Sequence, residues 1–172
     1  MKGNGMKTNI KKLTFLALSS ALALVLSYLE SLLPPIIITV PGIKIGLSNL
    51  VIICLLYRYG AREAAAVSLV RLTSIFMMFG GVTTMAYSLA GAFISLSLMA
   101  LFKRLSLFST VGVSVIGGVT HNLGQILVAV FLFDSLSIGY YMIVLAITGT
   151  VAGAFIGLSA TFLLKRLNTL LK

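Results

Sequence analysis

The sequence predicts an all-α, polytopic membrane protein with six transmembrane helices, and three observations lead to this prediction. Apolar residues make up 59% of the 172-residue chain and charged residues only 9%, whereas soluble domains carry about 25% charged residues. Six apolar runs follow one another along the chain, which is long enough for about six spans of roughly 20 residues each. The basic residues gather at the ends of these runs, where helices leave the membrane.

The first apolar run sets the N-terminal boundary of the membrane domain. It extends from Leu13 to Leu33 and follows a polar, basic segment, residues 1–12, which we expect to be a flexible cytoplasmic tail. The lysines and the sequence Ala21-Leu22-Ala23 are also typical of a cleaved signal peptide. The run continues far enough past that sequence to cross the membrane, so we expect a retained helix.

Five further spans complete one transmembrane domain over residues 13–166, followed by a short cytoplasmic tail, 167–172. Pro34-Pro35 ends the first helix because proline lacks an N–H donor. We expect residues 34–44 to form a folded loop at the outer interface. The remaining spans are expected at residues 45–58, 62–79, 83–102, 108–133 and 139–164.

The distribution of positive charge predicts that both chain ends are cytoplasmic. With the N-terminus inside, eleven of the 13 Lys and Arg residues face the cytoplasm, Lys44 lies outside and Arg71 lies within a span. This asymmetry is the positive-inside pattern of membrane proteins. It explains the net charge of +10 without nucleic-acid binding. The eleven inner residues are Lys2, Lys7, Lys11, Lys12, Arg58, Arg62, Lys103, Arg104, Lys165, Arg166 and Lys172.

Two spans carry polar side chains that are costly in lipid. Arg71 lies near the middle of the third span, and a charge at that depth costs about 2.5–3.5 kcal/mol on insertion scales. His121, Asn122 and Gln125 lie together in the fifth span, with His121 and Gln125 on one helical face. Each set is interpreted either as a ligand contact or as a structural element. For Arg71 the structural alternative is an ion pair with Glu30. For the residues of the fifth span it is interhelical hydrogen bonding.

Polar groups at the outer side of the first two spans complete a candidate pocket. Glu30 lies near the outer end of span one, and Lys44 and Asn49 lie at the outer start of span two. A pocket that opens outward between spans one, two, three and five would gather them with Arg71, under the loop 34–44. For Glu30 and Lys44 the alternative is an ordinary interfacial charge.

Small residues at four-residue spacing predict close helix packing. Ala17 and Ala21 form such a pair near the cytoplasmic end of span one, and Gly149, Gly153 and Gly157 form a longer series in span six. Such strips let two helices approach closely. The glycine series is expected to pack within the molecule, whereas the alanine pair is a candidate contact for a partner subunit.

The chain lacks the residues of a stand-alone enzyme. It has no phosphate-binding G-x-x-x-x-G-K-[ST] loop, and its three acidic residues are scattered, whereas magnesium-dependent diphosphate chemistry uses clustered carboxylates. Cys54 is the single cysteine and lies in an apolar run, which is typical of a small buried side chain. We therefore predict no catalytic residue, no metal site and no cofactor.

Four segments of the chain resemble a bacterial family. The segments Tyr28-Leu29-Glu30-Ser31 to Pro34-Pro35 and Pro41 to Asn49, the Arg71 helix, and Thr120 to Gln125 resemble heptaprenyl diphosphate synthase component I, also labelled the Gx transporter family. The resemblance covers nearly all of residues 13–165. It implies that seven residues matter for binding: Glu30, Lys44, Asn49, Arg71, His121, Asn122 and Gln125.

The family is in turn similar to the S components of energy-coupling factor (ECF) vitamin transporters, which are six-helix membrane proteins with an outward-facing pocket. This implies uptake of an unidentified small polar or anionic molecule across the bacterial cytoplasmic membrane. Ala17 and Ala21 would contact a coupling subunit that works with two ATPases. The family's other name implies a non-catalytic membrane subunit of a prenyl diphosphate synthase. A purely structural membrane scaffold is the third hypothesis.

Overall fold

The computed structural model describes residues 3–32, 46–79 and 81–170, and within them every regular element is a helix. The all-α prediction is therefore confirmed for this part of the chain. The expected loop 34–44 lies outside the described residues. In chain order the elements are α1 (Gly3–Ser31), α2 (Asn49–Arg58), α3 (Ala61–Phe79), α4 (Val82–Leu105), α5 (Thr110–Phe133), the 3-10 helix η1 (Leu136–Tyr141) and α6 (Met142–Leu170).

Four stretches of helix are long and apolar enough to cross a membrane: residues 10–31, 82–105, 110–133 and 136–167. The protein is thus a multi-pass membrane protein by length and composition. α3 has 19 residues but carries Arg62, Glu63 and Arg71. α2 has only 10 residues, which at 1.5 Å per residue is about 15 Å, half the hydrocarbon thickness. Six full crossings with both ends cytoplasmic therefore stay a prediction.

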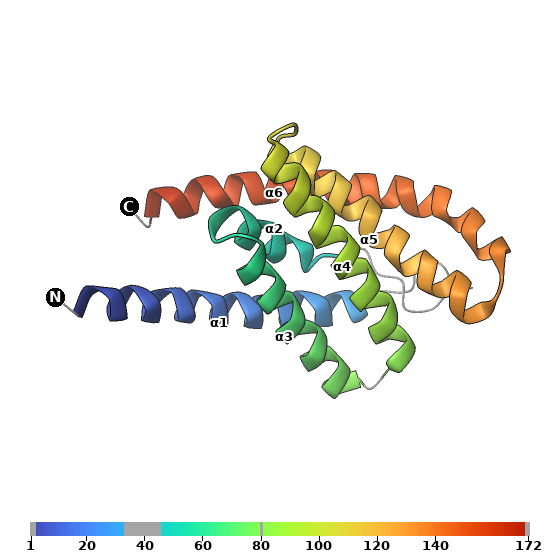
Figure 1. Cartoon of the computed structure of the whole chain (residues 1–172), viewed down its shortest axis with the longest axis horizontal. Helices are drawn as coiled ribbons and strands as arrows, with labels where there is room; N and C mark the ends of the chain where they lie inside the picture. Colours follow the sequence, from blue (N-terminus) through green and yellow to red (C-terminus); the bar gives the residue numbers. More distant parts are fainter. Residues whose placement is uncertain (1–2, 33–45, 80, 171–172) are drawn as a thin grey trace.

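α2 is the core of the bundle and not a surface helix. Its residues Val51 to Leu56 are all buried, as expected of a helix that is apolar on every side. α1, α3, α5 and α6 all contact it, and Figure 1 shows it enclosed by the longer helices. Cys54 belongs to this buried run, as the sequence predicts.

α4, α5 and α6 pack backbone to backbone. A Cβ atom added at Gly149 would lie 2.9 Å from the carbonyl oxygen of Gly118, and one added at Gly124 would lie 2.7 Å from the carbonyl oxygen of Ala90. Gly153 faces α5 in the same way. The glycine series of α6 is therefore an intramolecular packing face, as predicted, and α5 lies between two close neighbours.

Basic side chains meet at one end of the molecule. Lys12 of α1 forms an ion pair with Glu63 of α3 at 2.5 Å, the guanidinium of Arg58 lies over the Phe15 ring, and Lys103 donates to the carbonyl of Leu56. Figure 1 shows the start of α1 and the end of α6 at one end of the molecule and η1 at the other. α1 already begins at Gly3, so the segment expected as a flexible tail continues the first helix.

The α5–α6 contact yields a stability prediction. Gly118→Ala places a methyl group against the carbonyl of Gly149 and should lower the free energy of unfolding by about 1–3 kcal/mol. Gly139→Ala is the matched control, because nothing lies within 4 Å of a Cβ atom there. Thermal unfolding in detergent, followed by circular dichroism, compares the two variants. Equal melting temperatures would contradict the described helix contact.

Candidate functional site

Arg71 is the centre of the candidate site. It lies near the middle of α3, and only 6% of its surface is exposed. Its Nη1 group donates to the hydroxyl of Ser27 on α1 at 3.2 Å and also to the hydroxyl of Ser48, just before α2. Its Nε group has no hydrogen-bond partner among the described residues. Three separate parts of the chain thus surround one buried guanidinium.

Glu30 supplies the opposite charge. Its carboxylate interacts electrostatically with Arg71 and accepts a hydrogen bond from the backbone N–H of Gly46. Gly46 has a φ of 88°, a left-handed conformation that favours glycine. The turn at Gly46 therefore points its N–H at Glu30 while Ser48, two residues later, reaches Arg71. Glu30 is 5% exposed, so this is a buried polar group and not an interfacial charge.

These residues line one small cavity. Its volume is about 20 Å³, close to the roughly 10–15 Å³ that one water molecule needs by this measure. The wall contains the guanidinium of Arg71 from α3, the carboxylate of Glu30 from α1 and the imidazole of His121 from α5, together with hydroxyl groups. The residues that line it are Ser27, Glu30, Gly46, Arg71, Leu72, Ile75, Ser88 and His121.

His121 enters the cavity from α5 and is held from both sides. The Nε2 atom of Gln125 lies 3.2 Å from the ring Nε2 of His121, so the orientation of that amide and the tautomer of the imidazole are linked. On the other side lies Gly91 of α4, where an added Cβ atom would lie 2.9 Å from the ring Nδ1. Gln125 is completely buried. It contacts His121 but is not among the residues that line the cavity.

Three predicted site residues remain, and each has a different position. Asn49 is buried at the edge of the site, where its amide faces the position of a Cβ atom on Gly46. Asn122 points the other way, because its amide donates to the carbonyl of Leu145 on α6 at 2.8 Å. This bond is interhelical, the structural alternative left open for the fifth span. Lys44 lies outside the described residues.

Ala17 and Ala21 lie on the outward face of α1. Both are exposed, and they share this face with large apolar side chains. Leu18, Leu22 and Val25 are each at least half exposed. The opposite face of α1 carries Ser19, Ala23, Ser27 and Glu30 and is buried. The alanine pair is therefore available to lipid or to a partner, and it takes no part in internal packing.

Several residues of the site were not among the predicted ones, and four of them hold or approach its polar groups. Ser27 and Ser48 hold the Arg71 side chain, and Ser88 and Gly91 bring α4 to the cavity. Ser27 lies one helical turn before Glu30, and Ser48 precedes Asn49 in a motif that was singled out. Both spacings are visible in the sequence. The contribution of α4 has no comparable signal, because serine and glycine are common in membrane helices.

The acidic side chains of the chain do not converge on the cavity. The chain has three carboxylates in all, and the structure separates them: Glu30 lies in the cavity, Glu63 pairs with Lys12 at the basic end, and Asp134 caps the end of α5. Among the described residues no group of three His, Cys, Asp or Glu side chains is placed to hold a metal ion. A fixed guanidinium beside hydroxyl and imidazole groups can bind an anionic or carbonyl group by hydrogen bonds.

Comparison with known proteins gives one match. The model of a family described as heptaprenyl diphosphate synthase component I matches residues 19–163. This range contains Glu30, Asn49, Arg71, His121 and Gln125. Searches of curated proteins and of solved structures find no match.

The electrostatic interaction between Glu30 and Arg71 predicts energetic coupling. Glu30→Gln and Arg71→Met should each lower the free energy of unfolding by about 3–5 kcal/mol, because each leaves a buried charge without its counter-charge. The loss in free energy of unfolding for the double variant should be clearly smaller than the sum of the losses for the two single variants. Thermal unfolding of the three variants in detergent measures this.

Glu63→Gln is the control for this cycle. It removes a partly exposed ion pair with Lys12, and such solvent-screened pairs contribute little to stability. Strictly additive losses for Glu30→Gln and Arg71→Met would show that the two side chains do not act together.

Proposed function

The chain belongs to the heptaprenyl diphosphate synthase component I family, and we propose that it serves as a membrane-embedded binding subunit for a small polar or anionic molecule. The proposal places the protein in a bacterial cytoplasmic membrane with both chain ends inside. The molecule enters from the outer side and is taken up with the help of energy-supplying partners. The chain itself contributes recognition and no catalytic group.

The observation that supports this most strongly is the buried guanidinium of Arg71 in the wall of a cavity. A charge at this depth is costly, and a purely structural ion pair would be expected to satisfy every donor of the side chain. Arg71 instead keeps its Nε group without a hydrogen-bond partner among the described residues. A carboxylate, phosphate or carbonyl oxygen of a ligand would complete its hydrogen bonding. Glu30 and His121 would then form hydrogen bonds with other polar groups of the ligand and so select for those groups.

The size of the cavity restricts how binding occurs. About 20 Å³ is far below the roughly 300–1,000 Å³ of pockets for small molecules. The described conformation is therefore a closed one, and ligand entry requires the helices around Arg71 to separate. Such a movement must be driven, either by the free energy of ligand binding or by a partner protein.

The outward face of α1 is the proposed contact for that partner. Ala17 and Ala21 make a flat strip where another transmembrane helix can approach closely. The chain has no phosphate-binding loop of its own, so ATP-driven uptake would need separate ATPase subunits. In this scheme a coupling subunit docks on α1 and two ATPases act on that subunit, as in ECF transporters.

The family description favours a second candidate function. It names a component of heptaprenyl diphosphate synthase, which implies a separate catalytic component that makes a quinone side chain. This chain would then be a non-catalytic membrane subunit. The separation of its three carboxylates agrees with that role, since binding of diphosphate through magnesium uses clustered carboxylates.

Native mass spectrometry of the gently solubilised protein tests the first function. The wild-type spectrum should show a small-molecule adduct and, under mild conditions, companion subunits. Arg71→Lys keeps the charge but loses the planar fork, so it should lower adduct occupancy at least tenfold, and Ser48→Ala should lower it less. Ser159→Ala is the matched control, because that partly exposed serine bonds only to its own helix among the described residues.

Two results would contradict the binding proposal. One is a wild-type protein that carries no adduct and no companion in any preparation. The other is an adduct that survives Arg71→Lys unchanged. His121 gives an independent check, because it is the single histidine of the chain and its NMR signals should shift when the adduct is removed.

Reconstitution with the catalytic prenyl synthase component tests the second function. Activity of that component in vesicles should rise when this chain is present, if the chain supports the enzyme. The rise should persist with Arg71→Lys, because the buried site is not used for subunit support. Unchanged activity with and without this chain would exclude the subunit role.

A further inference from the structure

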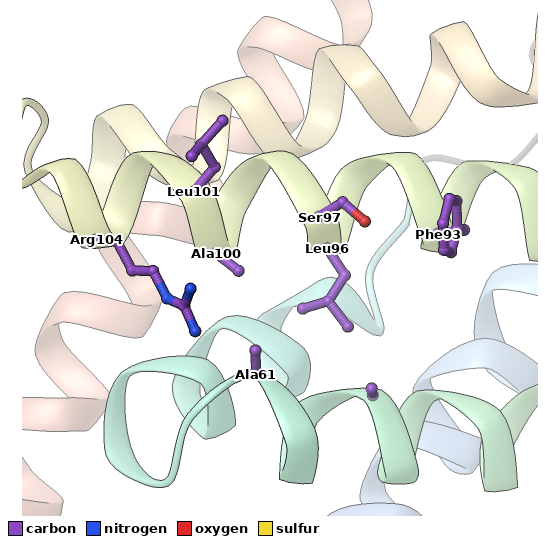
Figure 2. A pocket seen from close by; sticks show the side chains of 8 residues that line it. Ala61, Phe93, Leu96, Ser97, Ala100, Leu101 and Arg104 are labelled. Atoms are coloured by element: carbon purple, nitrogen blue, oxygen red, sulfur yellow. The ribbon is translucent and has the colours of Figure 1, made fainter.

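A second hollow lies on the membrane-facing surface, away from the Arg71 cavity. It is a groove of about 400 Å³ between α3 and α4, and Figure 2 shows Leu96, Ala100 and Arg104 extending from α4 toward Ala61 of α3. The lining residues are Ala61, Ala65, Phe93, Leu96, Ser97, Ala100, Leu101 and Arg104. Seven of the eight are uncharged and six of these are apolar, so the groove is hydrophobic along most of its length.

The groove follows directly from side-chain size. On α3, Ala61 and Ala65 lie one turn apart and therefore on one face. On α4, Ala100 continues the stripe that begins with the larger side chains Phe93 and Leu96. Where alanine faces alanine, the two helices leave space that larger side chains would have filled.

The length of the groove matches one leaflet of a bilayer. From Phe93 to Arg104 is eleven residues, or about 16 Å of helix, which is half of the ~30 Å hydrocarbon layer. α4 is among the helices able to span a membrane, and its apolar segment ends at Leu105. One end of the groove therefore lies at the expected membrane surface and the other near mid-depth.

A positive charge marks the surface end. Arg104 is exposed in the last turn of α4, and in Figure 2 its guanidinium extends from α4 toward the start of α3. Arg62, also exposed, directly follows Ala61 of the groove. Lys103 is directed elsewhere, since it donates to the carbonyl of Leu56. Neither Glu nor Asp is among the lining residues.

We propose that this groove binds one acyl chain of an anionic membrane phospholipid, with the lipid phosphate at Arg104. The apolar wall accepts the chain, and the guanidinium forms charge-assisted hydrogen bonds with the phosphate oxygens. The volume of about 400 Å³ lies within the roughly 300–1,000 Å³ of pockets that bind small molecules. A single leaflet-length chain fits these dimensions. This inference does not depend on the proposed function of the Arg71 site.

Native mass spectrometry of the full chain, released from vesicles of equal parts phosphatidylglycerol and phosphatidylcholine with matched acyl chains, tests the proposal. Phosphatidylglycerol should be retained about tenfold over phosphatidylcholine. Arg104→Gln should abolish this preference. Arg166→Gln is the matched control, because Arg166 is an exposed arginine near the C-terminal end of α6 and is not among the lining residues, and it should leave the preference unchanged.

A second variant tests the groove apart from its charge. Ala65→Leu fills the hollow from an exposed position, so it should lower retention of both lipids while the circular dichroism spectrum stays that of the wild type. Equal retention of the two lipids by the wild-type protein would overturn the proposal. So would an equal loss in Arg104→Gln and Arg166→Gln. Displacement of phosphatidylglycerol by equimolar farnesyl diphosphate would also overturn it and assign the groove to isoprenoid diphosphates.

Discussion

The burial of one guanidinium in the middle of an apolar bundle determines the arrangement of half the molecule. A charge at that depth costs several kcal/mol unless neighbouring groups offset it. α1 contributes Ser27 and Glu30 to Arg71, and the segment before α2 contributes Ser48. The left-handed turn at Gly46 and the start of the short α2 lie beside this guanidinium. The polar groups are therefore both a structural requirement and the best candidate for function.

The sequence predicted the convergence of the polar residues better than it predicted their individual contacts. Glu30, Arg71 and His121 line one cavity, because ionisable groups in membrane helices almost always face the bundle interior. Asn122 follows His121 directly and yet points to α6. Adjacent residues differ by about 100° around a helix, and the sequence alone does not reveal which neighbour each direction meets. Ser88 and Gly91 were not predicted either. α4 carries no charged residue at that depth to mark the face that meets the cavity.

Helix type and order were predictable, and helix length was less so. Hydropathy located each apolar run, and the described boundaries of α3 and α5 lie within two residues of the expected ones. α2 is the exception, with its first helical residue at Asn49 and only 10 residues in all. Apolar content alone does not distinguish a helix that crosses lipid from one that is enclosed by other helices. That distinction depends on contacts with α1, α3, α5 and α6, which are tertiary.

The glycine contacts divide the bundle into two parts with different mechanical properties. α4, α5 and α6 touch through backbone atoms, so none of them can slide without a steric clash. Within the described residues none of these backbone contacts at glycine involves α1 or α3, and α3 is partly separated from α4 by the groove. Any enlargement of the cavity would then be one-sided. His121 would keep its place in the rigid group of α4, α5 and α6, while Glu30 and Arg71 would move with α1 and α3.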